Sequence, residues 1–435
     1  MKVAVLGLWH LGSVTAACVA AAGHQVVAWD PNATTVEALS AGTPPVGEPG
    51  LAALVAAQLA SSRLSFSGDL AKAVRDADVV WVTFDTPVDA DDRAAVDTVV
   101  NSVIDSFPHL TDRAVVLVSS QLPVGTVRRL EREWAAHSEG RHVSFAASPE
   151  NLRLGEAIDV FTHPDRVVIG VRSESDRRRL TELFASITSS IEWMSVESAE
   201  MTKHAVNAFL AMSVAYINEL AGLCERVGAD AKEVERGLKT EQRIGPRAYL
   251  SPGGAFAGGT LARDVQFLRE LGRAHERPTA LIAGIEVSNT AHRHWAERRL
   301  VQELGTVDGR RVAIWGLTYK PGTDTLRRSG AIELCRWLTQ AGASVSVHDP
   351  AARDLPADMI AIERLDDAIT AATGADALVV ATEWPLYRTL DVNRLAAVMP
   401  AGLVLDANRF LGPMLGNDMR FRLISVGAMA RGQER

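Results

Sequence analysis

Hydrophobic positions in the first third of the chain form short valine-rich runs, separated by stretches with helical periodicity. The runs span residues 2–6, 25–29, 79–83, 114–118 and 167–171. Runs of this length and composition are typical of parallel strands buried on both faces. Because helix patterns alternate with them, this part of the chain is predicted to form a doubly wound α/β sheet.

The pattern changes at about residue 198, where apolar side chains begin to recur every three or four residues. These side chains are Met201, Ala205, Phe209, Met212, Tyr216, Leu220 and Leu223. The spacing predicts a long amphipathic helix. A further helical stretch is expected over residues 279–304.

A second series of strand patterns follows the turn-rich residues 305–309. It occupies residues 311–315, 344–348, 377–381 and 403–405. We therefore expect an α/β protein in three parts. These are a first α/β domain over residues 1–197, a central helical region over 198–304 and a second α/β domain over 305–435.

The apolar segment 3–23 has the hydropathy of a secretory signal, but Trp9-His10, Gly7 and Gly12 interrupt it. Another strand-like run follows at residues 25–29, so strand, glycine turn, helix and strand is the better interpretation. We expect no other stretch to be long and apolar enough to span a bilayer, and hence a soluble protein.

Composition narrows the possible partners. Among 435 residues, 45 Lys and Arg stand against 53 Asp and Glu, for a net charge of −8. Without a basic block, nucleic acid is not expected as the main partner. Cys18, Cys224 and Cys335 are far apart and predict neither a disulfide framework nor a zinc site, which favours a reducing cytoplasm. His292 and His294 suggest a metal pair, but residues two apart do not share a helix face, so a surface helix is expected.

A glycine motif lies between the first strand and the first helix, with the sequence Gly7-Leu8-Trp9-His10-Leu11-Gly12. Asp30 ends the second strand, where an acid accepts hydrogen bonds from the ribose of a dinucleotide and favours NAD over NADP. Trp9 occupies the position where the fingerprint has its middle glycine. A domain that keeps the fold and binds the dinucleotide poorly, or not at all, therefore remains an alternative.

The chain contains many further motifs, and in their sequence and order it resembles the UDP-glucose/GDP-mannose dehydrogenase family. They include Glu48-Pro49-Gly50-Leu51, Thr86-Pro87, Pro123-Val124-Gly125-Thr126, Ser148-Pro149-Glu150-Asn151-Leu152-Arg153, Ala199-Glu200-Met201-Thr202-Lys203, Asn207-Ala208-Phe209-Leu210-Ala211, Gly316-Leu317-Thr318-Tyr319-Lys320-Pro321, Asp349-Pro350 and Thr382-Glu383-Trp384. The resemblance implies two Rossmann-like doubly wound domains bridged by a helical dimerisation region. The first would bind NAD and the second the nucleotide of a GDP- or UDP-linked sugar, in a homodimer.

The resemblance also implies roles for individual residues. Cofactor contacts are expected from Gly7, Leu11, Gly12, Asp30, Thr86, Gln121 and Arg327. Substrate contacts are expected from Glu150, Leu152, Arg153, Lys203, Asn207, Arg243, Phe256, Gly258 and Lys320. Catalytic roles are expected for Lys203, Asn207, Asp264, Glu150 and Thr260.

Thr260 stands where the family has the cysteine that traps an aldehyde during a second oxidation. A threonine hydroxyl is a poor replacement, because its pKa lies far above that of a thiol. Gln121 and Leu154 likewise replace a threonine and a glutamate of the family pattern. We therefore expect one two-electron oxidation of a secondary alcohol to a ketone. Lincosamide-type pathways, which use relatives of this family on a GDP-linked octose, would supply such an alcohol.

Other interpretations stay open. The chain could oxidise its sugar twice by a cysteine-free route, or bind a nucleotide sugar without catalysis, as Trp9 and the acidic Asp85 suggest. Glu200 and Lys203 could form a solvated helix pair. Asn207 could cap or cross-link helices, and Asp264 could pair with Arg263 or cap a helix. The helix over 201–223 could be core alone or a dimer helix.

Overall fold

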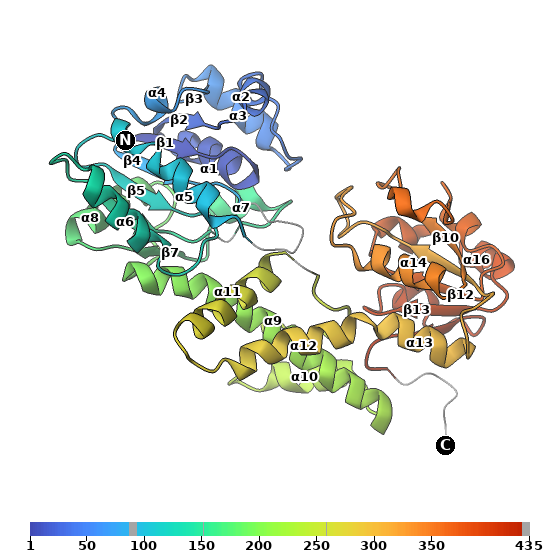
Figure 1. The fold of residues 1–435 in the computed structure, drawn as a ribbon. Helices are drawn as coiled ribbons and strands as arrows, with labels where there is room; N and C mark the ends of the chain where they lie inside the picture. Colours follow the sequence, from blue (N-terminus) through green and yellow to red (C-terminus); the bar gives the residue numbers. More distant parts are fainter. Residues whose placement is uncertain (87–93, 151, 258, 429–435) are drawn as a thin grey trace. The chain divides into compact units, whose positions relative to one another are not determined.

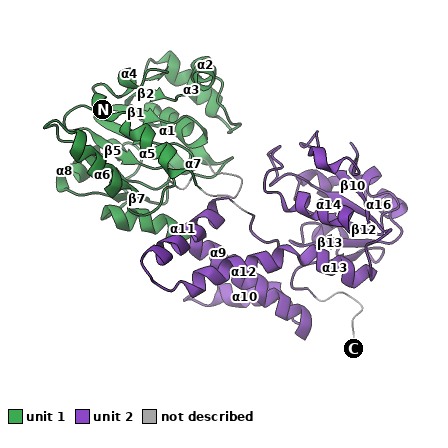
Figure 2. Ribbon diagram, in the orientation of Figure 1, with its two compact units in different colours: residues 1–206 green, residues 207–435 purple. Residues whose placement is uncertain are grey.

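The computed structural model of the chain describes residues 1–86, 94–150, 152–257 and 259–428. They form two compact units, Met1–Val206 and Asn207–Arg435 (Figure 2). Pro87, Asn151 and Gly258, which the sequence motifs include, lie outside the described residues.

The first unit contains an eight-stranded sheet in the order β3-β2-β1-β4-β5-β6-β7-β8 (Figure 1). The strands are β1 (Lys2–Leu6), β2 (Gln25–Trp29), β3 (Leu64–Ser67), β4 (Val79–Val82), β5 (Val115–Val118), β6 (Ser144–Ala147), β7 (Val167–Gly170) and β8 (Ile191–Met194). Successive side chains of a strand point to opposite faces. Accordingly, Val3 and Val5 of β1 join one hydrophobic cluster, whereas Ala4 and Leu6 join another. The sheet therefore has a core on each face.

The helices of this unit cover those two faces. They are α1 (His10–Ala21), α2 (Ala33–Ser40), α3 (Leu51–Ala60), α4 (Leu70–Val74), α5 (Val96–Ile104), α6 (Thr126–His137), α7 (Ala157–Thr162) and α8 (Glu174–Phe184). Helix α1 is buried continuously from Leu11 to Ala20, which explains why its sequence is apolar on all sides. The segment that resembles a secretory signal thus forms β1 of the eight-stranded sheet and the helix α1 that packs on it.

The direction of β7 differs from the sequence expectation of a parallel strand at residues 167–171. Ala147 of β6 pairs with Gly170 of β7 in antiparallel fashion, while β7 and β8 are parallel. Antiparallel neighbours need no crossover helix, and the six-residue α7 is too short to form one. The chain leaves β6 at the carboxyl edge of the sheet, where Ser148, Pro149 and Glu150 follow the strand.

Helix α9 (Val196–Val227) is continuous and extends from the first unit into the second. In the second unit its buried positions include the small residues Ala208, Ala211 and Ala215. Three of the large side chains that predicted the helix are instead exposed, with Phe209 at 60%, Tyr216 at 48% and Leu223 at 62%. The interpretation of this stripe as core alone is therefore wrong.

Four helices follow α9. They are α10 (Ala231–Thr240), α11 (Thr260–Ala274), α12 (Ala280–Arg293) and α13 (Trp295–Leu304). The stretch expected as one helical pattern over 279–304 is divided at His294, which has φ −83° and ψ 15°. The His294 ring lies 2.9 Å from the carboxylate of Glu297 in the first turn of α13, so this side chain marks the new helix start.

The rest of the second unit is a six-stranded sheet in the order β11-β10-β9-β12-β13-β14. Its strands are β9 (Arg311–Trp315), β10 (Ser344–His348), β11 (Glu363–Arg364), β12 (Ala377–Val380), β13 (Leu403–Asp406) and β14 (Arg422–Ile424). Helices α14 (Gly330–Gln340), α15 (Ala368–Ala371), α16 (Val392–Val398) and α17 (Gly412–Leu415) accompany it. The strand order repeats that of β3-β2-β1-β4-β5-β6, which confirms the prediction of two Rossmann-like domains.

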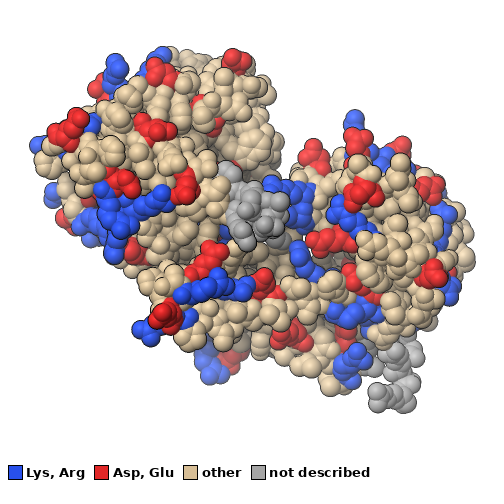
Figure 3. Space-filling model, in the orientation of Figure 1, with Lys and Arg blue, Asp and Glu red and all other residues tan. Residues whose placement is uncertain are grey.

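Two further properties concern the expected absence of membrane and nucleic-acid partners: the hydropathy of α9 and the distribution of charge on the surface. By length and composition α9 could cross a membrane, with a mean hydropathy of 1.3 over an 18-residue window that is 50% buried inside the protein. The expectation that only residues 3–23 could pass such a test is therefore wrong, although core helices of soluble proteins pass it too. On the face drawn in Figure 3, acidic and basic side chains are interspersed over both units.

Candidate active site

The turn between β1 and α1 requires glycine at two positions. Gly7 has φ +93°, and a Cβ there would lie 2.5 Å from the ring of Phe84. A Cβ on Gly12 would lie 1.6 Å from the carbonyl oxygen of Gly7. The backbone of α1 therefore approaches the turn as closely as a dinucleotide cradle requires.

Asp30 at the end of β2 fixes the conformation of this turn. The N–H of Leu8 donates to its Oδ2 at 2.7 Å, and the N–H of Asn32 donates to its Oδ1 at 2.9 Å. Asp30 stays partly exposed. A carboxylate held in this way is oriented to accept hydrogen bonds from the hydroxyls of a ribose.

Trp9 does not obstruct the geometry of the backbone here. Its φ of −74° and ψ of −150° are open to any residue, and its side chain is 53% exposed. Among the described residues no side chain caps the first turn of α1. The first N–H groups of α1, including that of the otherwise buried Leu11, are thus left for an anion such as a pyrophosphate. These residues fit a dinucleotide.

Two further residues expected near the cofactor follow β4 and β5. Thr86 Oγ1 donates to the carbonyl of Gln121 at 2.6 Å, so the structure brings these two together. Gln121 also lines a cavity of about 20 Å³, large enough for one water molecule. Arg327 lies in the second unit, on an exposed position between β9 and α14.

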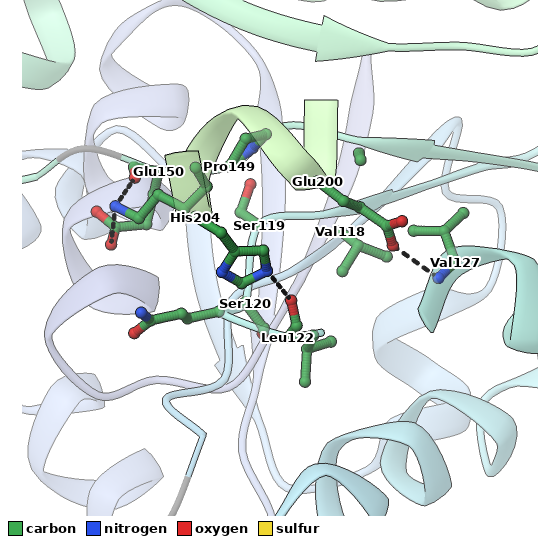
Figure 4. A pocket seen from close by; sticks show the side chains of 12 residues that line it. Val118, Ser119, Ser120, Leu122, Val127, Pro149, Glu150, Glu200 and His204 are labelled. Atoms are coloured by element: carbon green, nitrogen blue, oxygen red, sulfur yellow. Dashed lines mark hydrogen bonds and ion pairs between the residues drawn. The ribbon is translucent and has the colours of Figure 1, made fainter. Parts of the chain in front are cut away.

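Lys203 and Glu150 both line this small cavity, in which Figure 4 labels Glu150. Lys203 Nζ donates to the backbone carbonyl of Glu150 at 2.6 Å and lies 3.7 Å from its Oε1. The N–H of Leu152 donates to the other carboxylate oxygen of Glu150 at 2.6 Å. The Lys203 side chain is only 10% exposed, so an ammonium is held at the carboxyl edge of the first sheet. Arg153, the next residue, is exposed.

Glu200 and His204 hold the turn of α9 that carries Lys203. Glu200 accepts the N–H of Gly125 at 2.7 Å and that of Val127 at 2.9 Å, at the start of α6. The His204 Nε2 and the carbonyl oxygen of Leu122 are 3.0 Å apart, and Figure 4 shows this contact and that between Glu200 and Val127. Burial raises the pKa of Glu200, although the two N–H groups oppose this shift. Because Glu200 is buried, the alternative of a solvated Glu200–Lys203 pair is wrong.

Asn207 and Asp264 form a second polar pair, within the second unit. Asn207 Nδ2 donates to Asp264 Oδ2, and this bond joins α9 to α11. Both residues are buried. The helix cross-link that the sequence left open for Asn207 is therefore present, and its partner is the acid expected to act in catalysis. On the continuous α9, Lys203 and Asn207 are one helical turn apart.

Thr260 is the first residue of α11 and is exposed, after Gly259 with φ 104°. Gly258, two residues before Thr260, lies outside the described residues. Burial raises the pKa of Cys18 and of Cys335 to about 12, which leaves both as unreactive thiols. Cys224 is buried in a hydrophobic cluster of the second unit. The described cysteines therefore provide no accessible thiolate to replace Thr260.

A cavity of about 730 Å³ in the second unit is large enough for a nucleotide sugar. Its lining includes Lys239, Arg247, Tyr249, Phe256, Arg388 and Asn408. Of the residues expected to bind substrate, Phe256 lines this cavity. Arg243 instead pairs with Glu241 at 2.9 Å, and its side chain is 88% exposed.

Four side chains hold the loop over residues 253–256 in place, a role that the sequence did not predict for them. Asn218 accepts the N–H of Gly253 at 3.0 Å, and Asn408 accepts that of Gly254 at 2.7 Å. Asn289 forms two bonds to the backbone of Phe256, at 3.0 and 2.8 Å. The loop is thereby fixed by two helices and the end of β13.

The fourth of these side chains is His292. Its Nε2 lies 2.7 Å from the carbonyl oxygen of Gly253, and burial lowers its pKa, which favours the neutral ring. Helix α12 buries Ile285 and Asn289 and is otherwise partly or fully exposed, in agreement with the expected surface helix; His292 is half-buried, and His294, just after the helix, is exposed. Among the residues that the structure describes, no group of three His, Cys, Asp or Glu could hold a metal ion.

The second sheet repeats the glycine turn of the first. Gly316 has φ +90°, and the N–H of Leu317 donates to Asp349 at 2.6 Å, as that of Leu8 does to Asp30. Asp349 is only 1% exposed. Burial opposes its ionisation, but four backbone N–H groups outweigh it and lower the pKa. The carboxylate of Asp349 is thus already occupied by backbone N–H groups of the second unit. Lys320, which is partly exposed, lies in the loop that follows Gly316.

Comparison with known proteins identifies the family. The NAD-binding, central and UDP-binding domains of the UDP-glucose/GDP-mannose dehydrogenase family match residues 1–188, 197–291 and 313–413. A UDP-glucose 6-dehydrogenase of Rhizobium meliloti (strain 1021) is 35% identical over 437 residues, which cover 98% of this chain and 99% of that protein. A UDP-glucose dehydrogenase structure from the hyperthermophilic archaeon Pyrobaculum islandicum is 32% identical, with a TM-score of 0.83 over 90% of this chain and 91% of that one. The chain therefore belongs to the UDP-glucose/GDP-mannose dehydrogenase family and is an NAD-dependent nucleotide-sugar dehydrogenase.

Proposed function

We propose that the enzyme oxidises a secondary alcohol of a nucleotide-linked sugar to a ketone, with one NAD reduced per sugar. The observation that carries this proposal is the combination of Thr260 at the start of α11 with the preserved pairs Lys203–Glu150 and Asn207–Asp264. The groups suited to alcohol oxidation are present. The thiol that a second oxidation uses in this family is absent from that position.

When bound, NAD supplies the acceptor for the hydride. The Lys203 ammonium stabilises the negative charge that develops on the carbinol oxygen as its proton leaves. Asn207 positions that oxygen by a hydrogen bond, and Asp264 accepts the proton through a water molecule. The C–H and O–H bonds of the carbinol break, a C=O bond forms, and the proton is released to solvent.

Glu150 has a positioning role in this proposal. Its carbonyl and carboxylate both face the Lys203 ammonium, at 2.6 and 3.7 Å, which fixes the position and direction of that group. Gly7, Gly12 and Asp30 are proposed to hold the dinucleotide, with the Thr86–Gln121 contact beside it. The cavity at Phe256, together with Lys320, is proposed to hold the nucleotide sugar, and Arg327 is proposed to contact the cofactor.

The product explains why the reaction stops. A second oxidation needs a hydrogen on the carbonyl carbon and a nucleophile that forms a covalent adduct, and a ketone has no such hydrogen. A threonine hydroxyl is also little ionised near neutral pH. A side-chain alcohol of an octose, as in lincosamide-type pathways, is a substrate of this class.

A second candidate is the four-electron oxidation of a primary alcohol to a uronate. It is favoured by the curated relatives, which are named UDP-glucose 6-dehydrogenases in Rhizobium meliloti and Pseudomonas aeruginosa. Incubating the enzyme with NAD and a panel of UDP- and GDP-linked sugars, followed by mass spectrometry, separates the two candidates. A product that has lost two hydrogens supports the single oxidation, and a carboxylate product overturns it.

We also propose that the chain acts as a cytoplasmic homodimer. The exposed apolar side chains Phe209, Tyr216 and Leu223 recur along one stripe of α9, and Val227 continues it at 78% exposure. A second copy of this helix would remove the stripe from water. Analytical ultracentrifugation of the wild type and Leu223→Asp tests this, and a wild-type monomer would contradict it.

A further inference from the structure

Glu48 is a buried carboxylate in the segment before α3, and its side chain is only 1% exposed. Three donors surround it. His10 Nε2 lies 2.9 Å from Oε2, the N–H of Gly155 donates to the same oxygen at 2.8 Å, and the N–H of Ala157 donates to Oε1 at 2.9 Å. All of these residues belong to the first unit.

The donors come from two separate parts of the proposed site. His10 is the first residue of α1, directly after the glycine turn that fits a dinucleotide. Gly155 and Ala157 end the segment that carries Glu150, Leu152 and Arg153. Glu48 therefore connects the cofactor turn to the segment expected to contact the sugar. It contacts the side chain of His10 in the first and the backbone N–H groups of Gly155 and Ala157 in the second.

A buried carboxylate responds strongly to the loss of any donor, because burial leaves it without water. For Glu48 burial opposes ionisation, but the N–H groups of Gly155 and Ala157, together with His10, outweigh it and lower the pKa. The three contacts consequently depend on one another. A change in the position of His10 alters the support that Glu48 gives to residues 155 and 157.

We propose that His10 and Glu48 are positioning residues that couple occupation of the glycine turn by NAD to the order of residues 152–157. Binding of NAD fixes the start of α1 and with it His10, so Glu48 holds the substrate segment more firmly. The nucleotide sugar then binds more tightly to the NAD complex than to the free protein. The proposal rests on the proposed placement of both ligands, but its test needs no turnover.

Limited trypsin digestion reports the order of this segment, because the exposed Arg153 lies two residues before Gly155. Arg113 of the same unit, also exposed, is an internal control remote from the Glu48 contacts. Mass spectrometry follows cleavage after each residue in the full-length protein, with and without NAD. For the wild type we expect NAD to slow cleavage after Arg153 about fivefold or more, and cleavage after Arg113 to stay within about twofold.

Three variants test the connection. His10→Phe removes the donor and should abolish the effect of NAD on Arg153, whereas His10→Gln keeps a donor and should restore part of it. Glu48→Gln should raise cleavage after Arg153 about tenfold even without NAD. Thermal unfolding establishes that the variants are folded. If His10→Phe does not fold, Glu48→Asp is used in its place. This variant keeps the charge on a shorter side chain and should weaken the protection of Arg153 by NAD.

Two results would overturn the proposal. One is protection of Arg153 by NAD in folded His10→Phe equal to that in the wild type. The other is a wild type in which calorimetry shows NAD bound while cleavage after Arg153 does not change. Absence of NAD binding in calorimetry would instead contradict the proposed cofactor placement, so the two failures are distinguishable.

Discussion

Replacing Lys203 with alanine removes the ammonium on which the proposed alcohol oxidation depends. In the structure this group is 10% exposed, 2.6 Å from the carbonyl of Glu150 and 3.7 Å from its carboxylate. Loss of a group that stabilises developing charge typically lowers the rate about 10²–10⁴-fold, or about 2.7–5.5 kcal/mol of transition-state stabilisation. We expect kcat for Lys203→Ala to fall within that range.

The same change should affect folding much less. The Glu150 side chain is 25% exposed, so water can replace part of what its carboxylate loses. The lost hydrogen bond to a charged group corresponds to about 1.5–3 kcal/mol of unfolding free energy at most. Lys203→Ala is therefore expected to remain folded, with NAD affinity close to that of the wild type.

Stopped-flow measurement of NADH formation at saturating substrate gives kcat, and calorimetry gives the affinity for NAD. Thermal unfolding is measured alongside, and Lys72→Ala, a change at an exposed lysine of α4 in the same unit, serves as the control. A folded Lys203→Ala enzyme with kcat within tenfold of the wild type would refute the role assigned to this ammonium.

The remaining predictions concern the nucleophile position and the two ligands. Thr260→Ala should lower kcat about tenfold or less, because Thr260 only fills the space of the missing thiol; an inactive variant, or a covalent adduct in intact-mass spectra during turnover, would contradict this. Asp30→Ala should reduce the preference for NAD over NADP in calorimetry, since its carboxylate repels a 2′-phosphate; an unchanged ratio would count against the assignment. Lys320→Ala should raise the KM for the nucleotide sugar far more than it alters NAD affinity; a change in NAD binding alone would be the wrong outcome.

Buried strands were predictable because they consist of continuous apolar runs. The residues 2–6, 25–29, 311–315 and 344–348 match β1, β2, β9 and β10 without change. Four of the strands that the pattern missed, β3, β8, β11 and β14, lie at the edges of their sheets. Edge strands are half exposed and short, so their sequences contain no apolar run to detect.

Only those residues of the candidate site that lie close together in the sequence could be predicted from it. Gly7, Gly12 and Asp30 are read from one strand–turn–helix unit, and the structure places them together. The contact of Glu48 with Gly155 spans 107 residues, and that of Glu200 with Gly125 spans 75. Both depend on which strand ends the topology brings side by side, and no spacing in the sequence reports that.

The stripe on α9 illustrates a different limit. Its periodicity correctly predicts a helix, but periodicity alone does not say which face is buried. The large residues Phe209, Tyr216 and Leu223 are exposed, whereas alanines such as Ala211 pack inside, because α9 lies against its neighbours through small side chains.

The number of NADH molecules formed per sugar decides whether this enzyme performs one two-electron oxidation, as we propose, or two. A limiting, weighed amount of a nucleotide-sugar substrate is converted to completion with excess NAD, and NADH is measured by its absorbance against the sugar consumed. We expect one NADH per sugar and a ketone product. Two NADH per sugar, with a carboxylate product, would contradict it.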